Sequence, residues 1–168
     1  MSYLADIRSQ GTIEAYQALV DRIPYARLLG LSIQAIDERG RVVTKMPFDH
    51  RIVGNPNLPA VHGGVIGAFL EMAAIFQLVH EVEGDRLPKP INLTVDYLRS
   101  VGPRDTLATA TITKHGRRVA NVRVEAWQDD RDRPVAAAHG HFLMPQSRDA
   151  PAGLELNPPA PGSGSASA

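Results

Sequence analysis

The sequence predicts an α+β fold with an antiparallel sheet of about five to six strands, one long central helix and short helices before it. Apolar residues recur at every second position in several segments, which is typical of strands with one packed face. Residues 63–82 are apolar on nearly every side, which is typical of a helix surrounded by other elements. The connections between the later strand segments are short, which favours antiparallel neighbours.

The N-terminal part of the chain predicts two short helices. Apolar side chains recur at helical spacing in residues 12–21, and Thr12 is placed to cap the first turn. Pro24 has no amide hydrogen to donate and therefore ends this helix. A second short helix is expected over 25–29, where Gly30 can close it.

Several segments alternate apolar and polar residues with the period of a strand. They are residues 32–36, 41–48, 91–97, 108–113, 120–126 and 136–142. The first two flank a polar turn and predict a hairpin, whereas 46–59 reads as a loop rich in Pro, Gly and Asn. The connections at 101–104, 115–117 and 129–133 are short, so we expect consecutive later strands to lie beside each other.

The apolar helix needs cover on more sides than one flat sheet provides. Small residues at the inward strand positions let a sheet approach a helix closely. These residues are Ala108, Ala110, Ala120, Ala136, Ala138 and Gly140. Two arrangements remain open: the sheet curls around the helix, or a second subunit covers the remainder.

The length of 168 residues is enough for one domain with a sizeable core. We divide the chain into an N-terminal helical extension over 1–30, a main domain over 31–144 and a tail over 145–168. The tail is rich in Pro, Gly, Ser and Ala, which cannot bury a core, so we predict that it is disordered.

Composition excludes several classes of function. Lysine plus arginine and aspartate plus glutamate both number 18, so there is no basic surplus for nucleic acid. The chain has no cysteine, which excludes disulfides, a thiol nucleophile and cysteine-bound metal. The N-terminus is too polar for a signal peptide, and the apolar run over 65–79 is too short and polar for a membrane span. We therefore expect a cytoplasmic protein that binds neither nucleic acid nor membranes.

Glu71 lies in the middle of the apolar helix, where a charge needs an explanation. Its neighbours three and four residues away are Gly67, Ala68, Ala74 and Ile75. An isolated carboxylate in such surroundings either faces a wet cavity or has a raised pKa. A carboxylate of raised pKa beside a cleft suits a general base or a nucleophile. The alternative is a solvent-facing position on the helix.

Gly63 and Gly64 stand at the start of the same helix. Backbone amides at a helix N-terminus, together with the helix dipole, can hold an anion or a developing oxyanion. The alternative is that the glycines only let the loop enter the helix. With Glu71 two turns further on, the catalytic interpretation is favoured.

The His-Gly-Gly motif at 62–64, with Glu71 nine residues after the histidine, resembles the hotdog-fold acyl-CoA thioesterases of the phenylacetate-pathway, PaaI-like type. The resemblance covers about residues 27–143. It implies a hotdog fold over 31–144, in which the antiparallel sheet is wrapped around the long central helix. It also implies a thioesterase that hydrolyses an acyl-CoA to a free acid and coenzyme A, with no metal or other cofactor. It also implies that Glu71 is the base or nucleophile and that the amides of the motif form the oxyanion hole.

The family also uses a loop asparagine, usually six residues before the histidine, where this chain has Pro56. Asn55 and Asn57 flank that point, and either is a candidate for the catalytic asparagine. Some relatives hold the water with a Ser or Thr at positions that are Ala74, Ile75 and Pro90 here. The candidates to replace it are Gln77, Asn92 and Thr94.

Further residues are candidates for substrate binding. His62 and Gly63 border the site, and Asn92 is near the start of a strand. Arg117 and Arg118 occupy a turn and suit the phosphates of coenzyme A, although a turn is also a normal place for solvated arginines. A pair of histidines at 139 and 141 shares a strand face, but nothing else is spaced to complete a metal site.

The resemblance implies a homodimer or a dimer of dimers, with the active site at the subunit interface. Phe69, Met72 and Phe76 on the helix suggest an apolar acyl site for medium-chain or aromatic groups. Two other functions remain open. One is a non-catalytic acyl-CoA-binding protein, and the other is a hotdog dehydratase or hydratase.

Overall fold

The computed structural model describes residues 2–144, so the predicted tail over 145–168 lies outside the described residues. The elements in chain order are α1 (Tyr3–Gln10), α2 (Ile13–Arg22), α3 (Pro24–Leu28), β1 (Ser32–Ile36), β2 (Val42–Met46), the 3-10 helix η1 (His50–Ile52), β3 (Val53–Asn55), β4 (Ala60–Val61), α4 (Gly63–Glu81), β5 (Lys89–Tyr97), β6 (Thr106–His115), β7 (Val119–Trp127) and β8 (Ala136–Leu143). The predicted α+β fold is confirmed.

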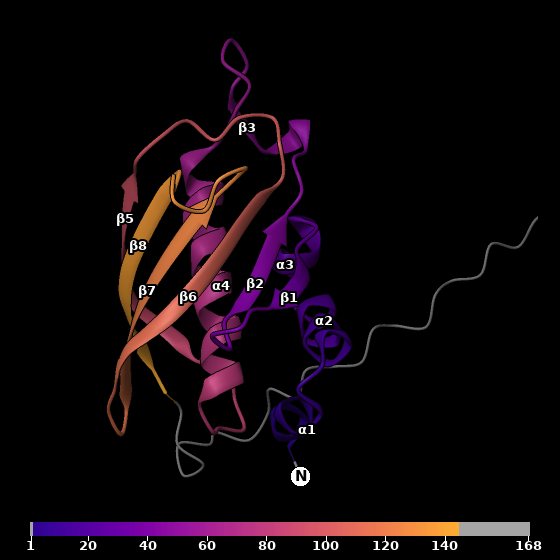
Figure 1. Ribbon diagram of the computed structural model, residues 1–168, viewed down its shortest axis with the longest axis vertical. Coiled ribbons are helices and arrows are strands. Elements are labelled where there is room, and N and C mark those ends of the chain that lie inside the picture. Colours follow the sequence, from indigo (N-terminus) through magenta and orange to yellow (C-terminus); the bar gives the residue numbers. More distant parts are fainter. Residues whose placement is uncertain (1, 145–168) are drawn as a thin grey trace, which may run out of the picture.

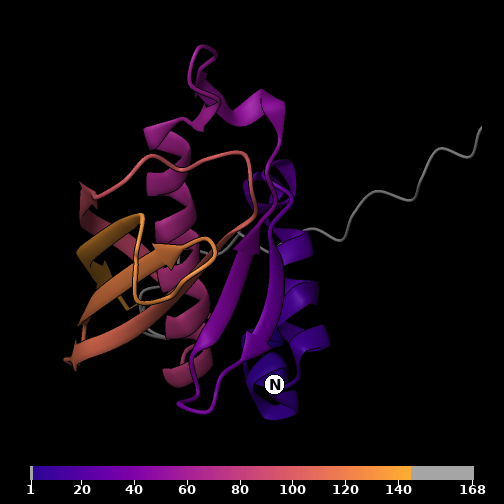
Figure 2. The same ribbon diagram turned by 45° about the horizontal axis from the view of Figure 1, so that its top comes forward.

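Six strands form one antiparallel sheet in the order β1-β2-β6-β7-β8-β5. In Figure 1 this sheet lies in front of α4, and Figure 2 shows β6, β7 and β8 on one side of the helix and β1 and β2 on the other. The sheet therefore curls around α4, which was one of the two arrangements that the sequence left open.

The expectation that β5 and β6 are neighbours is wrong. β6 pairs with β2 and β7, whereas β5 pairs with β8 and forms an edge. The connection over 98–105 crosses the end of the sheet (Figure 1), where the amides of Leu98 and Arg99 both donate to the carbonyl of Val135 at 3.0 Å. Three strand spacings amount to about 14 Å. Eight extended residues reach about 26 Å, so a short connection did not require adjacent strands.

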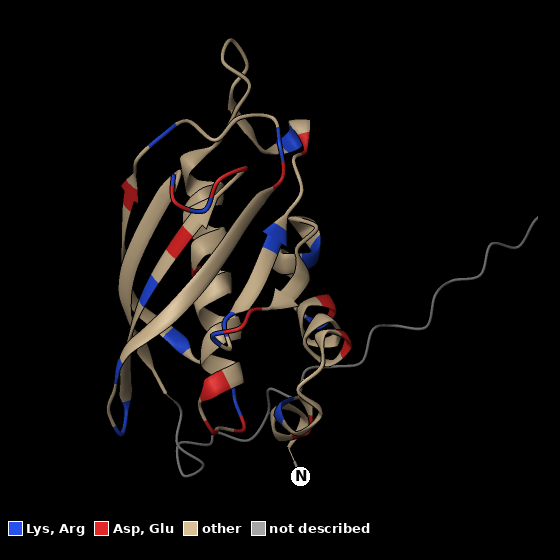
Figure 3. Cartoon of the chain, in the orientation of Figure 1, with Lys and Arg blue, Asp and Glu red and all other residues tan. Residues whose placement is uncertain are grey.

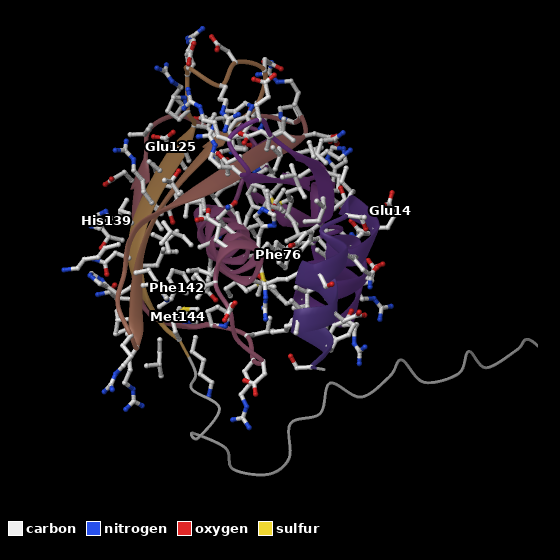
Figure 4. All side chains as sticks on the ribbon, turned by 60° about the horizontal axis from the view of Figure 1, so that its bottom comes forward. Glu14, Phe76, Glu125, His139, Phe142 and Met144 are labelled. Atoms are coloured by element: carbon white, nitrogen blue, oxygen red, sulfur yellow. The ribbon has the colours of Figure 1, made fainter. Side chains whose placement is uncertain are left out.

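The main core lies between α4 and the concave face of the sheet. The small residues predicted to face inward are all buried, and they allow the close approach of helix and sheet. Figure 4 shows Phe142 of β8 between the sheet and α4, on which Phe76 lies, whereas His139 points away from the core. Phe76 and Phe142 are both fully buried.

The N-terminal helices cover a second side of α4, away from β5 (Figure 1). The hydroxyl of Tyr16 on α2 lies 2.7 Å from Nδ1 of His80 on α4, and Tyr16 is only 1% exposed. The guanidinium of Arg8 on α1 donates to the carbonyl of Gly84 at 2.6 Å. The sequence analysis did not consider that these helices would supply part of the cover of α4.

The two predicted N-terminal helices are confirmed, and a third precedes them. Thr12 accepts from the amide of Ala15 at 3.2 Å as the N-cap of α2, and Pro24 begins α3. The unexpected helix is α1. Ser2 caps it, and Gly11 closes it in the left-handed region at φ 61°.

The Pro-rich loop before α4 is more ordered than predicted. β3 and β4 pair as a small separate hairpin, which projects at the top of Figure 1 beyond the N-terminal end of α4. The amide of His62 donates to the carbonyl of Ile52 at 2.8 Å, and the amide of Val61 donates to Val101 at 2.9 Å. These bonds position the start of α4.

By length and composition, α4 is apolar enough to cross a membrane. It packs against the sheet, α1 and α2, and the residues at 73–79 are all buried. This packing is that of the core helix of the fold.

Candidate active site

One stripe along the N-terminal half of α4 remains partly or fully exposed. Its members recur at intervals of three and four residues and therefore share one side of the helix. They are Gly64, Gly67, Ala68, Glu71 and Met72. The C-terminal half has no such stripe, because the sheet and the N-terminal helices enclose it. The helix is thus open where the His-Gly-Gly motif and Glu71 lie.

Glu71 is half-buried on this open stripe. Burial raises the pKa of its carboxyl group above the ordinary value of 4.5, because the charged form loses part of its hydration. Within residues 2–144 the carboxyl group has no hydrogen-bond or ion-pair partner. It is therefore available to an incoming water molecule or substrate.

His62 closes the first turn of α4 as its N-cap. Its Nδ1 atom accepts a hydrogen bond from the amide of Gly64 at 2.9 Å. A Cβ atom at position 64 would lie 3.1 Å from the same Nδ1 atom, so the glycine lets the imidazole approach. The amide that the sequence assigned to the oxyanion hole is thus held by a side chain of the motif itself.

Tyr97, at the end of β5, reaches the helix N-terminus from the sheet. Its hydroxyl donates to the carbonyl of Gly63 at 3.0 Å. A Cβ atom at Gly63 would lie 3.2 Å from the Tyr97 ring, and one at Gly67 would lie 3.8 Å from its hydroxyl oxygen. The sequence analysis missed this residue. The sequence signal that could have identified it is its position on the apolar face of β5.

Asn55 and Asn57 lie on the hairpin formed by β3 and β4, and both are exposed. The side-chain oxygen of Asn55 accepts from the amide of Asn57 at 3.1 Å, which is a turn-stabilising contact. The hairpin projects beyond the N-terminal end of α4 (Figure 2), whereas Glu71 lies about two turns inside that helix.

Gln77, a candidate to hold the water, has a structural role. It is fully buried, and its oxygen accepts from the amide of Val42 at 2.7 Å. Its nitrogen donates to the carbonyl of Gly40 at 3.1 Å and to Glu81 at 2.6 Å. These bonds join α4 to the β1–β2 hairpin and occupy the side-chain amide.

Asn92 and Thr94 lie on the outer face of the sheet, because the alternating residues Leu93 and Val95 face α4. The side-chain oxygen of Asn92 accepts from the backbone amide of His141 at 3.1 Å and lies 2.9 Å from its Nδ1 atom. Neither residue lies beside Glu71 of the same chain.

Arg117 and Arg118 lie in the β6–β7 turn, at the end of the sheet where β5 begins (Figure 1). Tyr97, which contacts the helix N-terminus, is at the opposite end of β5. A strand of that length spans about 27 Å. The two arginines are therefore far from the His-Gly-Gly motif of their own chain.

The side chains expected to line an acyl site divide into two groups. Phe69 and Phe76 are fully buried in the core between helix and sheet, so this expectation is wrong for them in the single chain. Met72 is partly exposed beside Glu71. The difference arises because the helix has one open side, which the apolar pattern alone did not reveal.

An antiparallel sheet curled around one long helix, with a half-buried carboxylate on the open side of that helix, defines a hotdog-fold protein. The family model for the thioesterase superfamily matches residues 58–135. The medium/long-chain acyl-CoA thioesterase YigI of Salmonella typhimurium is 30% identical over 129 residues, which are 68% of this chain and 81% of the relative. The chain belongs to the thioesterase superfamily.

Solved structures share this fold. A protein from Chromobacterium violaceum is 42% identical, with a TM-score of 0.68, and the match covers 86% of this chain and 97% of that one. The PaaI protein from the phenylacetic acid degradation operon of Escherichia coli is 20% identical, with a TM-score of 0.65 and coverage of 86% and 100%, and shows the fold alone. The predicted hotdog thioesterase, a thioester hydrolase, is confirmed. The roles of individual residues stay predictions.

Proposed function

We propose that this chain hydrolyses the thioester of an acyl-coenzyme A, with Glu71 as the catalytic carboxylate. The observation that carries the proposal is the position of Glu71, half-buried and without a partner among the described residues, on the one open stripe of the central helix. A half-buried acidic group of raised pKa beside a substrate site suits proton transfer.

The spacing along α4 supports this chemistry. Seven residues separate Gly64 from Glu71, which is about 10 Å along the helix axis. Side chains on a helix lean toward its N-terminus, so the carboxylate extends toward the glycines. The remaining gap suits a water molecule and a thioester carbonyl placed between the two groups.

In the proposed reaction, Glu71 takes a proton from water as the water oxygen attacks the thioester carbonyl carbon. The carbonyl oxygen becomes an oxyanion, which accepts a hydrogen bond from the amide of Gly63. The amide of Gly64 donates to it only when the imidazole of His62 gives up its own hydrogen bond to that amide. The carbon–sulfur bond then breaks, the thiolate takes up a proton, and the free acid and coenzyme A leave. The nucleophilic alternative, with a Glu71 anhydride, is distinguished by a single turnover in ¹⁸O-water, which labels the enzyme carboxyl group only in that case.

The exposed edge of β5 supports a homodimer with an active site at the interface. Ile91, Tyr97 and Leu98 are 57%, 59% and 52% exposed on or beside this strand. An unpaired strand edge with apolar side chains favours antiparallel pairing with a second copy. Such pairing places the second copy beside the open stripe of α4. It also places the β6–β7 turn of the second copy at the Tyr97 end of β5, where Arg117 and Arg118 of that copy can contact the substrate.

The acyl group is proposed to be medium- or long-chain. One support is the substrate class named for the YigI relative, and another is Met72 beside Glu71. A panel of acyl-CoAs from acetyl to palmitoyl, with phenylacetyl-CoA as the aromatic member, tests this preference through release of free thiol.

The test of the catalytic role is Glu71→Gln, which keeps the shape of the side chain. We expect kcat to fall by about 10²–10⁴-fold, with a smaller change in KM. Glu14→Gln is the matched control, because Glu14 is exposed on α2 (Figure 4) and should leave activity unchanged. Full activity of Glu71→Gln would overturn the assignment, and tight acyl-CoA binding by the wild type without turnover would instead favour the non-catalytic alternative.

A further inference from the structure

A pocket of about 190 Å³ lies between the β5–β6 and β7–β8 connections, outside the open stripe of α4. Three arginines line it, Arg99, Arg104 and Arg133, together with Asp129 and Asp130. The volume is several times the roughly 30 Å³ that a water molecule occupies, so the pocket admits phosphate groups.

The charges in this pocket are not balanced by the residues that the structure describes. Arg104 forms an ion pair with Asp129, and one oxygen of Asp130 accepts from the amide of Asp132 at 2.9 Å. The side chains of Arg99 and Arg133 have no hydrogen-bond or ion-pair partner within residues 2–144. The pocket therefore holds two guanidinium groups outside the Arg104–Asp129 pair, and only one carboxylate, that of Asp130, opposes their positive charge.

The pocket has a well-connected backbone frame. The carbonyl of Val135 accepts from the amide of Arg99 at 3.0 Å, which ties the two connections together. The side chain of Gln128 accepts from the amide of Gly102 at 3.2 Å and donates to the carbonyl of Arg104 at 3.0 Å. The arginines thus extend from connections that are held in place before any ligand arrives, which favours specific anion binding.

The pocket is at the same end of the sheet as the helix N-terminus. Arg99 follows two residues after Tyr97, whose hydroxyl contacts the carbonyl of Gly63. The carbonyl of Val101, between the arginines in sequence, accepts from the amide of Val61 just before the motif. Figure 3 shows basic segments of the β5–β6 connection above the N-terminal end of α4.

We infer that Arg99 and Arg133 bind the phosphates of the coenzyme A part of the substrate. The inference rests on the proposed function, because it assigns the substrate's anionic end to a pocket of the chain that carries the motif. Arg99 follows Tyr97 by two residues, which is at most about 7 Å of backbone, so it lies close to the residue that contacts the helix N-terminus. Arginine forks match phosphate oxygens bidentately.

The experiment compares Arg99→Ala/Arg133→Ala with the control Arg27→Ala/Arg39→Ala. The control removes the same charge from exposed arginines on α3 and the β1–β2 turn. Each protein is assayed with an acyl-CoA and with the matching acyl-N-acetylcysteamine thioester, which has no phosphate. We expect the test variant to raise KM for the acyl-CoA by roughly 10- to 100-fold and to leave the phosphate-free substrate unaffected.

Binding of adenosine 3′,5′-bisphosphate by calorimetry makes the inference independent of turnover. We expect this fragment to bind the wild type and the control, and the test variant to bind it at least about tenfold more weakly. Unchanged KM and unchanged fragment binding in the test variant would overturn the inference. Equal affinity of the wild type for inorganic phosphate and for the bisphosphate fragment would also overturn it. Equal increases of KM for the two thioesters in the test variant would do the same. An inactive wild type that binds the fragment through these arginines would refute the proposed hydrolysis and leave the phosphate pocket standing.

Discussion

The Nδ1 atom of His62 accepts a hydrogen bond from the amide of Gly64 at 2.9 Å, so the motif histidine is the N-cap of the central helix. Loss of this cap should destabilise the start of α4. We predict that His62→Ala lowers the free energy of unfolding by about 1 kcal/mol, whereas His62→Asn, which retains an acceptor, keeps most of it. Urea unfolding followed by the fluorescence of Trp127 measures both. Equal stability of the alanine variant and the wild type would show that the cap contributes nothing.

The raised pKa of Glu71 sets the pH dependence of activity. If the carboxylate is the base, kcat/KM should fall as pH falls through the pKa of Glu71 in the free enzyme. The inflection should lie above the ordinary value of 4.5, because burial disfavours the charged form. A pH–rate profile of the wild type with a phosphate-free thioester measures it. An acid limb that inflects at or below 4.5 would contradict the prediction.

The same shift predicts how Glu71 affects stability. Below the pKa of the unfolded chain, Glu71 is protonated in both states and costs nothing. As pH rises through the higher pKa of the folded state, the folded protein must ionise a half-buried group and loses stability. Glu71→Gln should therefore raise the melting temperature at neutral pH, and the gain should vanish near pH 4. A gain that grows on acidification would have the wrong sign.

Gly140 allows β8 to approach the edge strand β5 closely. A Cβ atom at this position would lie 2.5 Å from the carbonyl oxygen of Asn92. We predict that Gly140→Ala lowers the free energy of unfolding by about 2 kcal/mol, because backbone on both sides must shift. The matched control is Gly102→Ala, where the nearest atom is 3.8 Å away and little change is expected. Similar losses in the two variants would refute the steric explanation.

The edge of β5 is the proposed subunit interface. Ile91→Asp places a charge on this edge, and we expect light scattering to give the mass of a single chain, with activity reduced by more than about tenfold. Leu28→Asp is the control, since Leu28 is 63% exposed on α3, away from β5. A monomeric wild type, or a fully active Ile91→Asp monomer, would rule out a shared active site.

Much of the fold could be predicted because its signals are local. Thr12 and Pro24 mark helix ends through their own backbone chemistry, and the period of two marks each strand. The position of β5 could not be predicted. A connection of eight residues reaches an adjacent strand or one three places away, and only the pairing with β8 decides between them.

The candidate site was predictable in part for the same reason. Glu71 and Gly64 lie on one helix, so their spacing in sequence is also their spacing in space. The residues around them come from elsewhere. Tyr97 and Arg99 reach the helix N-terminus because the β5–β6 connection crosses that end of the sheet, and Gln77 is occupied because the β1–β2 hairpin packs against it.

The sequence by itself determined the elements, the apolar helix and the carboxylate within it, because those depend on residues close together along the chain. Only the tertiary structure decided which side of α4 stays open. That side is open because the curled sheet and the N-terminal helices cover the other sides, and this follows from long-range packing. Glu71 is consequently a half-buried group on the exposed stripe of a core helix, with no partner among residues 2–144.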